Sequence, residues 1–145
     1  LHIYGKGMLE DELKNITTEL GIEDKVIFEG FCKDVLTQIR KSGMYVLSSD
    51  YEGISNSLLE AMAIGMPVIS TDCPCGGARM LIEDSVNGLL VPVRDQKKLA
   101  EAMTYMADHE ELARKMGRKA GEVRERFSVA HIADQWISTL NKISK

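Results

Sequence analysis

The sequence lacks a long hydrophobic run and an excess of basic residues, and each lack excludes a class of protein. No apolar stretch approaches the roughly 20 residues that a membrane-spanning helix needs. The 18 basic residues are outnumbered by 22 acidic ones, and a net charge of −4 gives no electrostatic basis for binding nucleic acid. With 44% hydrophobic and 28% charged residues, the 145-residue chain has the composition of a globular domain of ordinary size.

Cysteine is also scarce. The chain has only Cys32, Cys73 and Cys75, and an odd number at these spacings is no disulfide framework. Tetrahedral zinc would need two more ligands beside Cys73 and Cys75, and no histidine lies near them in the sequence. We therefore expect no metal ion, and a reducing, cytoplasmic setting.

The chain starts with neither an initiator Met nor the charged-then-apolar layout of a signal peptide. Its first residues, 1–4, instead have the pattern of a strand interior. We therefore expect the chain to begin inside a larger protein.

Short apolar runs alternate with amphipathic stretches up to residue 91. The runs predict strands at residues 1–4, 26–28, 44–47, 68–71 and 89–91. The stretches predict helices at residues 8–20, 35–40, 57–64, 78–82, 96–108, 110–127 and 129–143. Apolar strands separated by helices are typical of a buried parallel sheet. We predict a doubly wound parallel-sheet α/β fold with extra C-terminal helices, forming a single domain over residues 1–145.

Glycines and apolar residues at helical spacing indicate further features of the predicted helices. Gly117 and Gly121 predict a break or bend within residues 110–127. One face of the first helix is apolar, formed by Leu9, Leu13, Ile16 and Leu20. The helix at 96–108 is expected to point Leu99, Met103 and Met106 inward. The last helix has an apolar stripe that we expect to pack on the domain itself, formed by Ile132, Trp136, Ile137 and Leu140.

In parallel sheets ligands bind at the carboxyl ends of the strands, so the loops there are the candidate sites. The first loop, Gly5-Lys6-Gly7, begins like a dinucleotide fingerprint, but Glu10 stands where the third glycine belongs, which disfavours a dehydrogenase. We interpret Gly5 and Gly7 as a tight turn that could lie beside a ligand. In the second loop, Phe31 is either exposed or packed under the next helix.

The third loop, residues 48–60, offers the most chemistry. Residues 55–57, Ser-Asn-Ser, are good N-caps, and a helix start presents free N–H groups and a positive dipole end to an anion. Gly53 lets the backbone approach a ligand closely. Glu52 and Glu60 flank the helix start, and a carboxylate accepts two hydroxyls at once, as a sugar or ribose offers.

Each glutamate also has a purely structural interpretation. Ser57 and Glu60 have the spacing of a capping box, in which the glutamate accepts a backbone N–H at the helix start. Glu52 could be a solvated loop carboxylate. The local sequence leaves both interpretations open.

Together, Glu52 and Glu60 match the Glu-x7-Glu signature of retaining glycosyltransferases with the GT-B fold, and the chain most resembles glycosyltransferase family 4. The flanks agree at Ser49 and at residues 59–69, and the segments 25–30 and 87–91 match further family segments in the same order. The resemblance covers nearly the whole chain. It implies the Rossmann-like, donor-binding C-terminal half of a two-domain enzyme of polysaccharide biosynthesis.

The resemblance also implies roles for individual residues. The donor sugar would be bound by Glu52, Gly53, Ile54 and Ser55, and the diphosphate by Asn56 and Ser57. Glu60 would bind the ribose. The nucleobase would be edged by Gly30, Phe31 and Cys32, and further candidates are Gly5, Gly7 and Lys33.

The implied donor is a nucleoside-diphosphate sugar, most often of uridine, bound without a metal or other cofactor. The implied acceptor is a glycan or a lipid-linked oligosaccharide. The family usually places an Arg and a Lys that neutralise the diphosphate before the strand that opens this chain, and its N-terminal acceptor domain is absent too. With no certain catalytic residue and no cation for the leaving group, we expect the chain alone to be inactive. The complete enzyme would be cytoplasmic, with peripheral membrane association.

Two alternatives share the fold, a sugar-nucleotide epimerase and a non-catalytic nucleotide-binding α/β module. The spacing of Glu52 and Glu60 disfavours the epimerase. A receiver-like module would need acidic residues where Gly5-Lys6-Gly7 stands.

The segment at residues 71–79 resembles the family's glycine-rich turn near the donor. Arg79 either meets a phosphate or lies solvated on a helix, which we favour. Cys73 and Cys75 are interpreted as packing residues.

Overall fold

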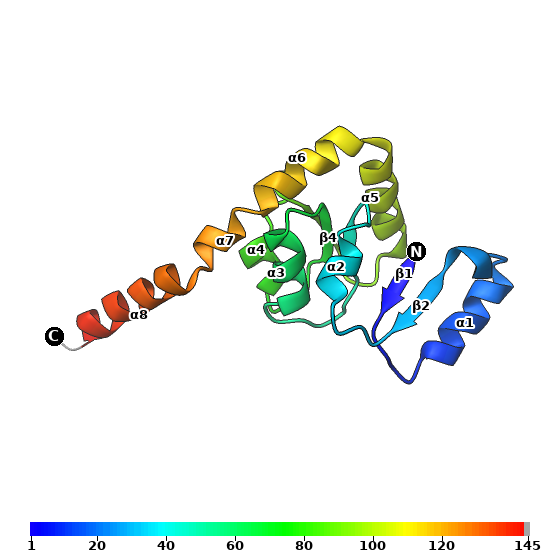
Figure 1. The fold of residues 1–145 in the computed structure, drawn as a ribbon, viewed down its shortest axis with the longest axis horizontal. Helices are drawn as coiled ribbons and strands as arrows, with labels where there is room; N and C mark the ends of the chain where they lie inside the picture. The colour runs from blue at the N-terminus through cyan, green and yellow to red at the C-terminus, as the bar shows by residue number, and fades with distance from the viewer. Residues whose placement is uncertain (144–145) are drawn as a thin grey trace. The chain divides into compact units, whose positions relative to one another are not determined.

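The computed structural model describes residues 1–143, which fall into two compact units, one of residues 1–38 and one starting at Ile39 (Figure 1). The first unit contains β1 (His2–Tyr4), α1 (Glu10–Glu19), the short 3-10 helix η1 (Glu23–Lys25) and β2 (Ile27–Gly30). β1 and β2 pair in parallel, with Ile3 opposite Phe28. Because α1 provides the crossover between them, the unit is one βαβ element.

The apolar face predicted for the first helix is present but is not covered. α1 has no buried residue, and its four predicted face residues are all exposed. The unit's own sheet has only two short strands, and Ile27 of β2 is itself exposed. The unit therefore offers little apolar surface against which this face could be buried.

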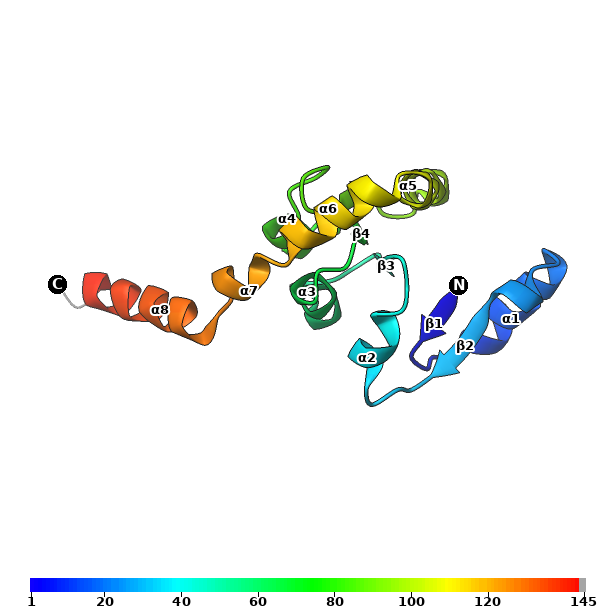
Figure 2. The same ribbon diagram turned by 45° about the horizontal axis from the view of Figure 1, so that its top comes forward.

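α2 (Val35–Ile39) spans the division between the units, and its last residue, Ile39, begins the second unit. This unit continues with β3 (Tyr45–Leu47), α3 (Asn56–Ala63), β4 (Val68–Thr71), α4 (Gly77–Leu81) and β5 (Leu89–Val91). Four further helices follow, α5 (Gln96–Asp108), α6 (Glu110–Ala120), α7 (Val123–Arg126) and α8 (Val129–Ile143). The strands form a parallel sheet in the order β3-β4-β5. Figure 2 shows α5 and α6 on one side of β4 and α3 on the other, so the predicted doubly wound α/β fold is confirmed.

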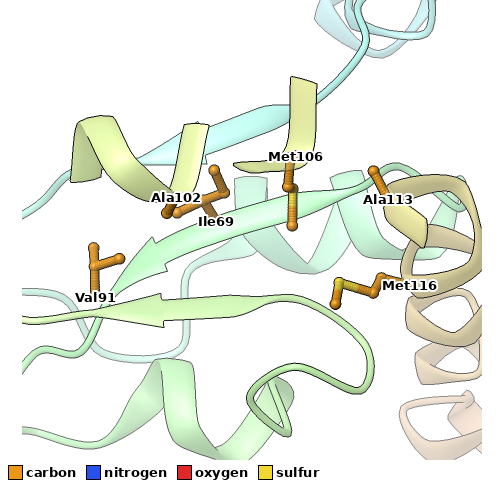
Figure 3. Close-up of a cluster of buried hydrophobic side chains, with 6 residues drawn as sticks. All are labelled: Ile69, Val91, Ala102, Met106, Ala113 and Met116. Carbon is orange, nitrogen blue, oxygen red and sulfur yellow. The ribbon is translucent and has the colours of Figure 1, made fainter. Parts of the chain in front are cut away.

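The core of this unit lies between the sheet and α5 and α6 (Figure 3). Every residue of β4 is buried, because β4 is the middle strand and helices cover both its faces. Met106 is 2% exposed, and Leu99 and Met103 pack partly buried against the same cluster, as predicted. The buried cluster comprises Ile69, Val91, Ala102, Met106, Ala113 and Met116.

Gly117 does not break the helix. α6 runs through it and ends at Ala120, and the break comes at Gly121, before α7. A Cβ atom at Gly117 would lie 2.4 Å from the carbonyl oxygen of Gly65. Gly117 therefore permits close approach of α6 to the turn after α3, which is a packing role rather than a breaking one.

The apolar stripe on the last helix is exposed, so the prediction that it packs on the domain is wrong. α8 has no buried residue, and Trp136, Ile137 and Leu140 are each more than half exposed. The helix itself forms over the predicted residues, because local spacing determines an amphipathic helix without determining what covers it. Across residues 1–143, no helix has the length and apolar character required to span a membrane.

Candidate functional site

The helix that follows β3 starts at a serine cap. Ser55 has an extended backbone (φ −73°, ψ 121°), and its Oγ accepts a hydrogen bond from the N–H of Leu58 at 3.4 Å. α3 therefore begins at Asn56, one residue before the predicted start. Within residues 1–143, the N–H groups of Asn56 and Ser57 donate to no backbone oxygen. These two donors and the positive end of the helix dipole are available to an anion.

The capping-box interpretation of Glu60 is wrong. The cap is Ser55 rather than Ser57, which places Glu60 beyond the third helical position that a capping box requires. In the described part of the chain, the carboxylates of Glu60 and Glu52 take part in no hydrogen bond or ion pair. Glu60 is exposed and Glu52 is partly buried, so both can accept hydrogen bonds from a ligand.

A tyrosine that the sequence analysis missed supports the start of α3. Tyr45, on β3, donates its hydroxyl hydrogen bond to Ser57 Oγ at 2.8 Å, and Ser57 Oγ lies 3.0 Å from Ser55 Oγ. Tyr45 stands in an apolar strand and gives no local signal of this contact. It fixes the rotamer of Ser57 at the helix start.

The two glutamates influence the same side chain, Tyr45. Burial raises the pKa of the Tyr45 hydroxyl, the hydrogen bond to Ser57 lowers it, and the negative charges of Glu52 and Glu60 raise it further. Both carboxylates are therefore near enough to this hydroxyl for their charges to act on it. Two carboxylates without a hydrogen bond or ion pair among the described residues thus act on a tyrosine whose hydroxyl contacts the start of α3.

The last residue of β4 and the turn that follows it contact the backbone of the loop before α3. Thr71 Oγ1 and Cys73 Sγ both donate to the carbonyl oxygen of Ser49, at 2.5 and 3.1 Å. Cys75 Sγ donates to the carbonyl oxygen of Glu52. Cys73 is buried, in agreement with a packing role, whereas Cys75 is exposed, so the packing interpretation is wrong for Cys75.

Two arginine–aspartate ion pairs lie in the loops that follow the strands of this unit. Arg79 is exposed on α4 and pairs with Asp72 through two hydrogen bonds of 2.5 Å. Arg94, in the loop after β5, pairs with Asp50 at 2.7 Å. Arg79 thus lies on the solvated helix surface, as favoured from the sequence, with its charge directed to a carboxylate.

The first unit carries a second candidate loop region. Gly5 N–H donates to the carbonyl oxygen of Gly30 at 2.8 Å, which joins the ends of β1 and β2. Both glycines have positive φ angles, 121° and 66°, which L side chains rarely adopt. Phe31 is 72% exposed, which decides between its two interpretations. Of the other candidates here, Cys32 is partly buried, and Gly7 and Lys33 are exposed.

Metal-binding geometry is not found. Within residues 1–143, no three or more His, Cys, Asp or Glu side chains are grouped so that they could hold a metal ion.

Comparisons with known proteins identify the family. The family described as "Glycosyl transferases group 1" matches residues 1–123. An uncharacterized glycosyltransferase of Haemophilus influenzae is 31% identical over 136 residues, which are 94% of this chain and 38% of that protein. An N-acetylgalactosaminyltransferase of Campylobacter jejuni, named for a diphospho-undecaprenol substrate, is 33% identical over 92% of this chain and 36% of its own length.

A solved structure agrees with the sequence relatives. HepE of Anabaena in complex with UDP superposes with a TM-score of 0.87 at 27% identity, covering 97% of this chain and 40% of HepE. The chain thus spans well under half the length of the proteins it matches. Because the family match covers most of its residues, the chain belongs to the group 1 glycosyltransferases.

Proposed function

We propose that this chain is the donor-binding, C-terminal domain of a retaining glycosyltransferase of family 4. The observation that carries the proposal is that Glu52 and Glu60, which flank the capped N-terminus of α3, have carboxylates with no hydrogen bond or ion pair within residues 1–143. A nucleoside-diphosphate sugar offers what this arrangement can bind, namely two sets of hydroxyls and an anion between them. The similarity to HepE, whose structure contains UDP, supports the same ligand class.

The roles of the residues follow from their chemistry. Glu52 accepts hydrogen bonds from hydroxyls of the donor sugar, with Gly53, Ile54 and Ser55 alongside it. The N–H groups of Asn56 and Ser57 bind the diphosphate, because these two donors lack backbone partners. Glu60, one turn into the helix, accepts from the ribose hydroxyls. The loop at residues 30–32 is assigned to the nucleobase by resemblance, and this assignment stays a prediction.

The acceptor and the rest of the enzyme are inferred from the relatives. Because this chain spans 36% of the Campylobacter enzyme, we propose that an acceptor-binding domain lies in the remainder of the full protein. That relative is named for a lipid-linked diphosphate acceptor, and we propose an acceptor of this kind or a glycan. No metal or other cofactor is proposed, since the helix start supplies the donors for the diphosphate.

The identity of the nucleobase can be tested by comparing nucleoside diphosphates. In ligand-observed saturation-transfer NMR, we expect saturation to pass from the protein to UDP. Addition of a UDP-sugar as competitor should weaken the UDP signal. GDP and ADP at equal concentrations serve as matched controls for the diphosphate and ribose. Preferential binding of GDP or ADP would replace uridine as the base, and absence of signal from all three would contradict donor binding.

This chain alone is expected to transfer no sugar. Arg79 and Arg94, which pair with carboxylates in the loops after β4 and β3, have their charges directed to Asp72 and Asp50 rather than to a leaving diphosphate. Incubation with radiolabelled UDP-sugars should release neither free sugar nor glycoside above the rate without protein. Release that depends on Glu52 would contradict this expectation.

A further inference from the structure

The turn between β4 and α4 contacts the backbone of the candidate donor loop directly. The Cys75 thiol donates to the carbonyl oxygen of Glu52, although the Cys75 side chain is otherwise exposed. The turn is shaped by Gly76, whose φ of 77° is left-handed and whose N–H donates to the carbonyl oxygen of Cys73 at 2.9 Å. An exposed thiol is thus directed at the backbone of a residue that carries one of the two carboxylates.

A second contact lies at the adjacent peptide. A Cβ atom at Gly77 would lie 1.8 Å from the carbonyl oxygen of Gly53 and 2.8 Å from the nitrogen of Ile54. These are backbone atoms and cannot rotate away as the end of a side chain could. The first residue of α4 therefore packs against the peptide that joins Gly53 to Ile54, and only glycine fits there.

We propose that Cys75 is a positioning residue for donor binding, acting together with Gly77 on the backbone of residues 52–54. The effect on donor binding rests on the proposed function, whereas the effect on the conformation of residues 52–54 rests on the two contacts alone. The thiol fixes the Glu52 carbonyl, and the close approach of Gly77 fixes the following peptide. Since Ser55 caps α3 directly after these residues, their conformation determines where the Glu52 carboxylate and the helix N–H groups lie relative to each other.

The test compares Cys75→Ala, which removes the donor, with Cys75→Ser, which keeps a donor in nearly the same place. Amide NMR spectra without ligand should show shifts at residues 52–54 in the alanine variant and a return toward the original positions in the serine variant. Affinity for UDP should fall roughly threefold in the alanine variant, as expected for one weak hydrogen bond, and recover with serine. Ser138→Ala, an exposed substitution on α8, is the control and should change neither quantity.

Each outcome decides the inference. Unmoved amides at residues 52–54 in Cys75→Ala would overturn it, as would moved amides with unchanged UDP affinity. If UDP binds neither the original chain nor any variant, the proposed function fails, and the ligand-free amide comparison still decides whether Cys75 sets the loop. Cys75 is exposed, so neither substitution is expected to prevent folding.

Discussion

Replacing Glu60 by alanine is expected to lower the affinity for UDP by roughly 10- to 100-fold. The estimate corresponds to loss of a charge-assisted hydrogen bond, about 1.5–3 kcal/mol. The Glu60 carboxylate has no partner among the described residues, so its removal breaks no contact within the domain. The midpoint of thermal unfolding should therefore stay nearly unchanged. Titration of UDP by NMR together with a melting curve by circular dichroism measures both quantities.

Glu111→Ala provides the matched control for this substitution. Glu111 is exposed in the first turn of α6, and its replacement makes the same change in net charge. UDP affinity should remain within about twofold, because a surface charge outside the site acts only through screened solvent. Equal losses of affinity in both variants would indicate a general charge effect and contradict a specific role for Glu60. A large fall in stability for Glu60→Ala alone would instead indicate that Glu60 caps the helix.

Replacing Gly117 by alanine is expected to cause a large loss of stability. The added Cβ would lie 2.4 Å from the carbonyl oxygen of Gly65, 2.8 Å from the nitrogen of Pro67 and 2.9 Å from the carbonyl carbon of Met66. Since all three are backbone atoms, α6 must move away from the turn after α3. Such overpacking costs about 1–3 kcal/mol or more, against a gain of about 1 kcal/mol in helix propensity. We expect a net loss of about 2 kcal/mol in the free energy of unfolding by urea.

Gly121→Ala is the control for this prediction. Gly121 has a helical backbone, φ −58° and ψ −16°, which alanine adopts readily. The nearest atom to an added Cβ is the Arg118 carbonyl oxygen at 3.2 Å, one turn earlier in the chain. The substitution should change the free energy of unfolding by less than about 0.5 kcal/mol. Equal stability of the two variants would contradict the assigned packing role of Gly117.

The local sequence pattern predicts the bounds of the helices and strands in the second unit well. It predicts less well which residues those elements contact. The observed bounds of β4, β5 and α5 equal the predicted ones. A short, continuously apolar run is typical of a buried strand, and the spacing of the apolar residues in α5 is typical of a helix. The face of α1 and the stripe of α8 were recognised as apolar, but spacing does not reveal what covers an apolar face. The predicted break is found at Gly121 but not at Gly117, because the contact of Gly117 with Gly65 lies far away in the sequence, whereas locally a glycine signals a break.

For the candidate site too, the sequence indicates residues but not the contacts between distant segments. The resemblance indicates Glu52 and Glu60, and the structure adds that neither carboxylate has a partner within residues 1–143 and that the charges of both act on Tyr45. Tyr45 and Cys75 gave no signal, because each acts through a contact between segments that are distant in the sequence. A strand tyrosine and a turn cysteine acquire these roles only when the fold brings β3, α3 and the turn after β4 together.

The central claim is that residues 52–60 bind a nucleoside diphosphate, and amide NMR during a titration with UDP tests it most directly. Binding is expected with a dissociation constant near 1 mM, about −4 kcal/mol, because Arg79 and Arg94 already pair with Asp72 and Asp50. The account predicts saturable shifts at residues 52–60, with those of Asn56 and Ser57 among the largest. Saturable shifts confined to other parts of the chain, or no shift at residues 52–60 at several times that concentration, would contradict it.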